Sequence, residues 1–499
     1  MKIYGLSQIG PLPMLMGAAV VAAALSFGSV YPDGALAQGA VTVKQFDDGG
    51  IYEGTFRNGK QHGQGTYRLP NGYEYSGNWV DGEIQGQGTA RFVNGSVYVG
   101  KFVDGKPSGR GKIVFADGTS YDGDWLDGQM TGQGLADYAD GAVYQGGFLN
   151  ARHHGKGILQ ETSGYVYDGD WVNGVREGNA IVTEADGAVY EGTMANGQRT
   201  GQGRISLPDG LIYVGDWAGG QFNGTGKLTF PNGDVYEGSF ADGRREGEGT
   251  MTYSGGSTYS GGFANDKRAG KGRFEGPDGF LYEGSWSEGQ MAGQGNLTYP
   301  DGSVYEGEFA DGNANGTGKI TYPDGSTYVG DWVAGVIEGT GVATYANGIV
   351  YEGGFRNAQT HGQGKMTYAD GYTYEGQWAN GQREGMGKAV YPDGTIYDGT
   401  FQNGLRDGIG TITISDGFSY VGDWKDGEIN GAGVATYSNG DVYEGQFRDS
   451  KRWGVGVMRY ASGEVEEGTW VNGVLKGGIP AEEPVEDEGG AAEAEANDG

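Results

Sequence analysis

The sequence predicts an all-β protein, built as one elongated array of about 19 β-hairpin repeats of 23 residues, with no globular catalytic domain. Three observations predict this fold. A tyrosine recurs every 23 residues from Tyr52 to Tyr443 without an insertion or deletion, and a nineteenth copy that lacks the tyrosine starts at Glu466. Glycine recurs at fixed places in each copy, and apolar and polar residues alternate between the glycines as they do in strands.

The glycine pattern indicates a backbone requirement. Counted from the tyrosine as position 0, positions 2 and 11 are glycine in all 19 copies, and position 20 is glycine in all 18 full copies. Position 13 is glycine except at Ala180 and Ile479. Periodic glycine is typical of a fixed conformation, whereas aperiodic glycine would indicate a flexible linker. We expect the strand glycines to let a neighbouring aromatic ring lie flat against the backbone.

The copy at residues 305–327 illustrates the expected hairpin. Its first strand runs from Tyr305 to Ala310, and Asp311-Gly312 forms a tight turn because both residues tolerate positive φ. The second strand runs roughly from Gly316 to Tyr322, and residues 323–325 (Pro-Asp-Gly) turn the chain back. The residues of this copy that we assign to the repeat core are Tyr305, Gly307, Phe309, Gly316, Gly318, Tyr322 and Gly325.

Two further positions predict contacts between side chains. Position 4 is aromatic in all copies except that of Met194 and mostly alternates between Phe and Trp, and alanine occurs at position 15 only in copies with Trp, as in Trp378 and Ala389. Since cores conserve volume, positions 4 and 15 are expected to touch, either across the hairpin or between adjacent copies. A single-layer sheet has two faces, so some of the rings are also expected to line an open groove.

The composition excludes several classes of function. The 499 residues include 65 acidic and 34 basic side chains, a net charge of −31, and no cysteine. Nucleic acid is excluded as a partner because phosphate binding needs a basic footprint. The charge also disfavours direct attraction to anionic lipid. The absence of cysteine rules out disulfides and thiol catalysis.

The ends of the chain differ from the repeats. Residues 1–37 have an apolar run at 12–27 and an Ala-Leu-Ala site at 35–37, which predict a signal peptide; an uncleaved N-terminal membrane anchor is the alternative. Either segment implies an exported protein, periplasmic or extracellular at the cell surface. Residues 38–51 form a half-repeat that caps the array at 52–479, and residues 480–499 form an acidic tail that we expect to be disordered.

No catalytic, metal-binding or cofactor-binding constellation is predicted, and the chain is not expected to be an enzyme. Three of the four histidines (His62, His154 and His361) recur at position 10 of distant copies, so they do not converge as metal ligands do. The Gly-x-Gly spacings precede no helix pattern, which argues against a phosphate loop. The repeated carboxylates are expected on the wet face of the strands, with weak calcium binding as the alternative.

A weaker signal is a series of basic residues after the first turn, mainly in the Phe copies. These residues could form a spaced basic row on an acidic body, with ordinary charged turn residues as the alternative. The members of this candidate binding face are Lys60, Lys106, Arg152, Arg199, Arg244, Arg245, Lys267, Arg268, Arg406, Lys451 and Arg452.

The pattern YEGxFxxGxxxGxGxxxYxDGxxY resembles the MORN repeat (membrane occupation and recognition nexus), in register over about residues 52–479. The Tyr-Glu-Gly opening is intact at residues 52–54, 236–238, 305–307 and 443–445. The resemblance implies a long twisted antiparallel array of hairpins. In the family such arrays serve as scaffolds, as dimerisation devices and as proposed lipid-binding modules, and some precede a kinase or methyltransferase domain.

The leading hypothesis is therefore a non-enzymatic scaffold or binding protein of an exported bacterial type, which presents a long repetitive β surface. Its partner would be an unknown protein or a second copy of the chain. The alternative is an envelope-binding module that holds membrane lipid headgroups or glycan in an aromatic groove.

Overall fold

A computed structural model describes residues 40–478, and all regular secondary structure in that range is β-strand. The chain divides after Ala139 into two compact units. The predicted signal peptide (1–37) and acidic tail (480–499) lie outside the described residues. Within residues 40–478, no helix has the length and apolar character that crossing a bilayer requires.

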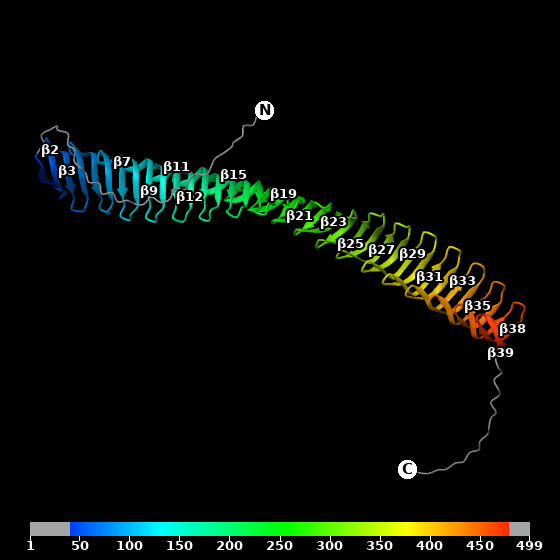
Figure 1. The fold of residues 1–499 in the computed structure, drawn as a ribbon. Helices are drawn as coiled ribbons and strands as arrows, with labels where there is room; N and C mark the ends of the chain where they lie inside the picture. The colour runs from blue at the N-terminus through cyan, green and yellow to red at the C-terminus, as the bar shows by residue number, and fades with distance from the viewer. Residues whose placement is uncertain (1–39, 479–499) are drawn as a thin grey trace, which may run out of the picture. The chain divides into compact units, whose positions relative to one another are not determined.

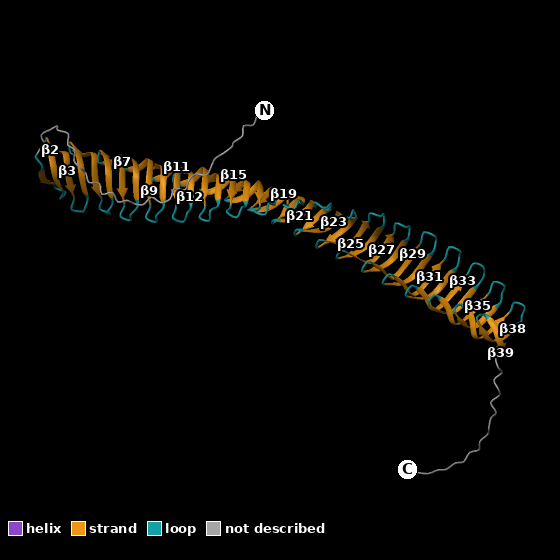
Figure 2. Ribbon diagram, in the orientation of Figure 1, coloured by secondary structure: helices purple, strands orange, loops and turns teal. Residues whose placement is uncertain are grey.

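Both units consist of short strands joined by short turns (Figure 1; Figure 2). The first unit contains β1 (Thr42–Gln45), β2 (Ile51–Arg57), β3 (Lys60–Arg68), β4 (Glu74–Val80), β5 (Glu83–Arg91), β6 (Val97–Val103), β7 (Lys106–Val114), β8 (Ser120–Leu126) and β9 (Gln129–Asp137).

The strands of the second unit alternate between seven and nine residues, except that the last, β39, has five. Its strands are β10 (Val143–Leu149), β11 (Arg152–Gln160), β12 (Val166–Val172), β13 (Val175–Thr183), β14 (Val189–Ala195), β15 (Gln198–Ser206), β16 (Ile212–Ala218), β17 (Gln221–Thr229), β18 (Val235–Ala241), β19 (Arg244–Thr252), β20 (Thr258–Ala264), β21 (Lys267–Glu275), β22 (Leu281–Ser287), β23 (Gln290–Thr298), β24 (Val304–Ala310), β25 (Asn313–Thr321), β26 (Thr327–Val333), β27 (Val336–Thr344), β28 (Val350–Arg356), β29 (Gln359–Thr367), β30 (Thr373–Ala379), β31 (Gln382–Val390), β32 (Ile396–Gln402), β33 (Leu405–Thr413), β34 (Ser419–Lys425), β35 (Glu428–Thr436), β36 (Val442–Arg448), β37 (Lys451–Arg459), β38 (Val465–Val471) and β39 (Val474–Gly478).

Within each unit, every strand pairs antiparallel with the strands before and after it in the chain, which confirms the predicted repeat of hairpins. In the hairpin β24–β25, Tyr305 lies opposite Ile320, and Ile320 in turn lies opposite Tyr328 of β26. Position 15 therefore stands between the tyrosines of its own and the following copy. The same register recurs from copy to copy, so each copy is joined to the next by a second set of ladder hydrogen bonds.

The two turns of a copy have different geometry. Asp311 and Gly312 have φ of 50° and 79°, the left-handed pair of a two-residue hairpin turn, as predicted. The second turn spans residues 322–326: the Tyr322 N–H donates to the Ser326 carbonyl at 2.8 Å, and Gly325 has φ of 87°. The Asp324 carboxylate accepts the Ser326 N–H at 2.8 Å, an Asx turn.

A β-bulge explains the invariant glycine at position 11. The register of β24–β25 shifts between Gly307 and Phe309, and Gly316, in the bulged stretch opposite, has φ of 73°. A side chain is strained at such a φ. Because the strand remains paired on both sides of the bulge at Gly316, β25 begins at Asn313, three residues before the predicted start.

The core tyrosine lies flat over the glycines at positions 2 and 13 of its own copy, as predicted, except in the copy where Ala180 replaces the second glycine. Tyr305 is 0% exposed, and a Cβ placed on Gly318 would lie 2.2 Å from its hydroxyl oxygen. The hydroxyl donates to the Glu308 carbonyl at 3.0 Å, and burial raises the pKa of Tyr305 to about 12. The glycines thus form a seat for the ring, which the repeat uses as its main core group.

The aromatic residue at position 4 links successive copies. Trp332 meets the rings of Tyr305 and Tyr328 edge-on at 5.1 and 5.6 Å, and its Nε1–H donates to the Gly318 carbonyl of the preceding copy at 3.3 Å. Where position 15 is aromatic, as in Phe274, its ring lies 6.4 Å from the position 4 ring of the following copy, here Trp286. The predicted contact between positions 4 and 15 is therefore confirmed, and it joins adjacent copies.

The structure does not explain why alanine at position 15 accompanies tryptophan in the same copy. Ala389 is 0% exposed and lies opposite Tyr374 and Tyr397, the tyrosines of two copies. Since a side chain at position 15 meets position 4 of the next copy, a direct exchange of volume between Ala389 and Trp378 does not account for the alternation.

Tyr322 departs from its assignment to the repeat core, because it is 37% exposed. β25 ends at Thr321, so Tyr322 is the first residue of the five-residue turn and not the last of the strand. At the start of the array, Lys44 of β1 lies opposite Tyr52, and Phe46 opens a turn of the same kind by donating its N–H to Gly50.

Candidate binding surface

Each unit has an inner face that carries the aromatic core and an outer face that carries charge. The side on which positions 0, 4, 9 and 15 lie is called the inner face. Positions 17 and 21 of the five-residue turns lie beside it. On the outer face, bases at positions 12 and 14 pair with acids of the next strand, as in Lys227–Glu237 at 2.6 Å. The predicted wet face is this outer face, and its exposed pairs contribute little to stability.

The core rings are largely buried. Tyr282 and Tyr305 are 0% exposed, and Trp286 and Trp332 are 6% exposed, so only a small part of a position 4 ring reaches the surface. Side chains at position 9 cover them from the side of the first turn. For example, the guanidinium of Arg452 lies 4.4 Å from the Trp470 ring and 5.9 Å from the Tyr437 ring of the five-residue turn.

The basic residues predicted as one row fall into two sets with opposite orientations. Position 8 opens the second strand and is exposed, in Lys60, Lys106, Arg152, Arg244, Lys267 and Lys451. Position 9 points to the inner face and is partly buried, in Arg199, Arg245, Arg268, Arg406 and Arg452.

The position 9 arginines are bound within the array. The guanidinium of Arg268 lies 4.1 Å from the Trp286 ring, and Nη2 donates to the Gly289 carbonyl of the next first turn at 2.8 Å. Sequence reasoning missed Arg176 and Arg383, which occupy the same position; Arg383 also donates to a turn carbonyl, that of Gly404, at 2.7 Å. Counting positions 8 and 9 separately would have found them, because they face opposite sides of the strand.

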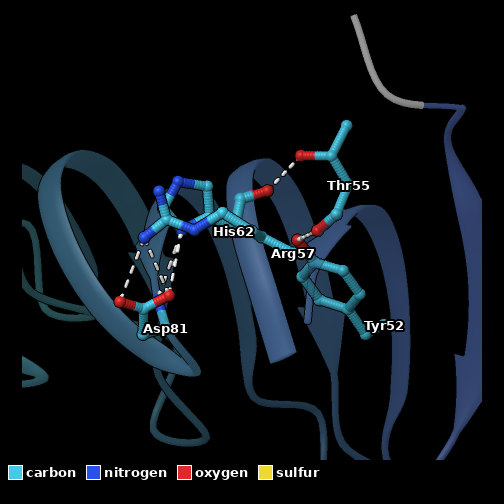
Figure 3. A network of polar contacts seen from close by, with 5 residues as sticks. All are labelled: Tyr52, Thr55, Arg57, His62 and Asp81. Carbon is cyan, nitrogen blue, oxygen red and sulfur yellow. Dashed lines mark hydrogen bonds and ion pairs between the residues drawn. The ribbon is translucent and has the colours of Figure 1, made fainter. Parts of the chain in front are cut away.

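Position 10 holds a polar contact between copies. His62 Nδ1 lies 3.4 Å from the Asp81 backbone N–H of the next turn, and the Arg57 guanidinium donates to the Asp81 carboxylate at 2.9 Å (Figure 3). Tyr52 and Thr55 close the same network through backbone carbonyls (Figure 3). Among residues 40–478 no cluster of three or more metal-ligating side chains occurs.

His153 occupies position 9, where it replaces the covering arginine. Its ring stacks on Tyr144 with centroids 3.6 Å apart and meets Trp171 edge-on at 4.8 Å. Burial lowers the pKa of His153 from 6.5 to about 4. The ring is therefore neutral near pH 7 and acts as one more aromatic group of the core.

The accessible rings belong to the five-residue turns. Tyr322 and Tyr345, both at position 17, are 37% and 41% exposed, and burial of the remaining surface raises the pKa of both phenols. Further along, the rings of Tyr368, Tyr372 and Tyr391 follow one another at centroid distances of 5.1 and 5.0 Å. The inner face thus has an aromatic rim, and turn residues make it.

Shallow cavities open between this rim and the first turns. One of about 370 Å³ is lined by apolar groups that include Leu207, Leu211, Trp217 and Phe222. An open, partly apolar hollow of this kind is a candidate site for ligand binding.

Comparison with known families supports the repeat assignment. The model of the MORN repeat matches 18 successive segments between residues 52 and 465. No curated protein matches the chain.

Solved structures give only distant similarity. The TCP10 domain of Danio rerio CPAP is 14% identical, with 49% of this chain and 98% of that chain covered and a TM-score of 0.16. The SAS-4 TCP domain of Drosophila melanogaster, in complex with a proline-rich motif of Ana2, is 12% identical over 43% and 99% of the two chains, with a TM-score of 0.20. Virginiamycin B lyase from Staphylococcus aureus is 9% identical over 63% and 94%, with a TM-score of 0.10. At these scores the similarities carry no argument about this chain.

Proposed function

Because the chain belongs to the MORN-repeat family over residues 52–465, we propose that it is a non-catalytic scaffold that is exported to the cell envelope and binds proteins along its repeats. The observation that supports the proposal is the repetition of one surface. The same hairpin, with one aromatic inner face and one polar outer face, recurs at 23-residue intervals, so an extended partner meets equivalent strands at many points.

Export is supported by the sequence of residues 1–37, with an apolar run followed by Ala35-Leu36-Ala37. A tagged full-length chain expressed in its own host should appear in the envelope or extracellular fraction. Deletion of residues 1–37 should retain it in the cytoplasm. Equal distribution of the two forms between the fractions would contradict export.

A second candidate function is binding of glycan or lipid headgroups. It is supported by the partly apolar cavity of about 370 Å³ beside Trp217 and Phe222, since aromatic surfaces stack on sugar rings and on acyl chains. Against lipid stands the net charge of −31, which repels an anionic membrane surface.

Co-sedimentation of the chain from Gln38 to Gly499 separates the two functions. The chain would be mixed with purified envelope sacculi, with anionic vesicles and with neutral vesicles. The scaffold proposal predicts that the chain stays in solution in all three. Pelleting with sacculi would favour glycan, pelleting with vesicles would favour lipid, and either result would contradict a scaffold that acts through protein contacts alone.

A further inference from the structure

Five consecutive copies carry tyrosine at position 17, and we call these residues the tyrosine row. Each is the first residue of a five-residue turn that its own N–H closes, as in Tyr345, which donates to the Ile349 carbonyl at 2.8 Å. The members of the tyrosine row are Tyr299, Tyr322, Tyr345, Tyr368 and Tyr391.

The fold does not require these rings. Position 17 is Glu161, Glu184 and Gly276 in other copies, and their turns close with the same pair of backbone hydrogen bonds. An aromatic ring there is consequently optional for folding. A large apolar group that is exposed and not needed for the fold marks a binding surface more often than a core.

The first three rings of the row also have no arginine at position 9 of the next copy. Elsewhere, an arginine at position 9 of the next copy reaches the position 17 ring, as Arg245 does at 5.8 Å from Phe230. The residues in the corresponding places beside Tyr299, Tyr322 and Tyr345 are Ala314, Ile337 and Thr360. None of these carries a charge or reaches as far as an arginine, which is consistent with the exposure of Tyr322 and Tyr345.

The spacing of the row selects a ligand conformation. Successive members are separated by two strands, which corresponds to about 9.6 Å. A polyproline II helix advances by about 9.3 Å per turn of three residues. A polyproline II segment that lies along the row therefore presents one residue to each tyrosine, and proline rings packed on aromatic side chains are the usual means by which such segments are recognised.

The acidic side chains beside the row favour a partner with positive charge. Asp301, Asp324, Asp370 and Asp393 are exposed two residues after their tyrosines. Each accepts a backbone N–H of its own turn, at 2.8 Å from Ser303 in the case of Asp301, and such a bond holds the pKa of Asp393 below its usual value. The four exposed carboxylates line the row with negative charge.

We propose that the tyrosine row binds a basic, proline-rich segment of a partner protein in the polyproline II conformation, with one helical turn per copy. This inference rests on the proposed scaffold function and specifies the partner's chemistry. Its basis is the match of pitch between strands and ligand, the exposed rings of Tyr322 and Tyr345, and the acidic border.

The test uses the full chain and a fluorescein-labelled 15-residue probe, five repeats of Pro-Ala-Lys. A probe of the same composition with its prolines in one block is the control for spacing. Fluorescence polarisation should show binding of the first probe and binding weaker by about tenfold of the second. Equal affinity for the two probes would refute recognition by pitch.

Two variants locate the site. The double variant Tyr322→Ala with Tyr345→Ala should weaken binding by about tenfold, because two stacking rings are removed. The matched control is Tyr253→Ala with Tyr437→Ala, which removes two rings at the same turn position outside the row and should leave binding unchanged. Circular dichroism should show the same strand content in both. An unchanged affinity in the first variant would refute the site.

A charge variant keeps the test valid if the tyrosine variant is unstable. Asn347 already makes the Asx turn in this row, with its Oδ1 3.2 Å from the Ile349 N–H. Replacing Asp301, Asp324, Asp370 and Asp393 by Asn should therefore preserve the turns. It should weaken binding of the Pro-Ala-Lys probe and leave binding of a Pro-Ala-Gln probe unchanged. Equal loss of affinity for both probes, or no loss for either, would refute the role of charge.

The outcomes also separate this inference from the proposed function. If no probe binds but a protein partner is captured at Tyr345 by photocrosslinking in cells, the inference fails and the scaffold function stands. If no probe binds and the chain pellets with sacculi or vesicles, both fail. If an envelope oligosaccharide displaces the bound probe, the row is a glycan site and the inference fails.

Discussion

The glycines at positions 2 and 13 both border the tyrosine ring, but the structure predicts that alanine is tolerated far better at position 13. A Cβ on Gly318 would approach the Tyr305 hydroxyl oxygen, Cζ and Cε2 at 2.2, 2.4 and 2.5 Å, all side-chain atoms. A Cβ on Gly307 would lie 2.5 Å from the Gly318 Cα and 2.8 Å from the Thr317 carbonyl oxygen, both backbone atoms. The ring can tilt away from the first methyl group, but the paired strands must separate to admit the second.

The magnitudes follow from what each change disrupts. Gly318→Ala displaces the ring and strains the hydroxyl's hydrogen bond, for a loss of about 2 kcal/mol. Gly307→Ala adds the separation of a strand pair and the loss of about two ladder hydrogen bonds, for a total of about 4 kcal/mol. The sequence agrees with this order, since position 13 contains Ala180 and position 2 contains only glycine.

Hydrogen exchange by mass spectrometry measures both losses locally. For peptides that span β24 and β25, exchange should accelerate about 30-fold in Gly318→Ala and about 1,000-fold in Gly307→Ala, at 1.36 kcal/mol per tenfold change. Exchange in β36 and β37 should not change, because stability in repeat arrays is largely local. Equal effects of the two substitutions, or a larger effect of Gly318→Ala, would refute the steric reasoning.

Three further predictions concern the inner face. Arg268→Ala should lower the free energy of unfolding by about 1–2 kcal/mol, because the stacking on Trp286 and the hydrogen bond to the turn are lost. Lys267→Ala should change the free energy of unfolding by less than about 0.5 kcal/mol. Denaturant titration measures both values, and equal effects would contradict the assignment of positions 8 and 9 to opposite faces. Burial lowers the pKa of His153 from 6.5 to about 4, so between these pH values the unfolded chain binds one more proton than the folded chain. The free energy of unfolding should therefore fall from pH 6.5 towards pH 4 more in the unmutated chain than in His153→Phe. Parallel curves of stability against pH for the two chains would contradict this. Ala389→Leu should overpack a fully buried site and lower the free energy of unfolding by about 1–3 kcal/mol. Since position 15 meets position 4 of the next copy, adding Phe401→Leu to this variant should restore much of the lost melting temperature. Absence of rescue in the double variant would contradict that contact.

Local chemistry predicted most of the fold. Asp311-Gly312 encodes a two-residue turn because both residues accept positive φ, and the alternation around Tyr305 encodes a strand with one buried face. The tyrosine seat followed from the pairing of an aromatic residue with strand glycines. These features depend on neighbours within one copy, which a repeated sequence displays many times.

The features that the sequence did not predict depend on register across copies. The start of β25 at Asn313 was missed because a glycine with positive φ at Gly316 has the composition of a loop, although it forms a bulge inside the ladder. The basic residues were grouped by proximity in sequence, whereas Lys267 and Arg268 point to opposite faces. The rings at positions 0 and 4 bury one another across copies, as Trp332 does with Tyr305 and Tyr328, and only the three-dimensional arrangement shows that contact.

The most direct test of the scaffold account is photocrosslinking in the native host at two positions of one copy. A benzophenone amino acid would replace Tyr345, on the exposed rim of the inner face, and in a second strain Val342, which is 37% exposed on the outer face. The account predicts a discrete protein adduct from Tyr345 and little or none from Val342. Adducts of equal yield at both positions, or the absence of any protein adduct at Tyr345, would contradict a scaffold that binds its partner through the inner face.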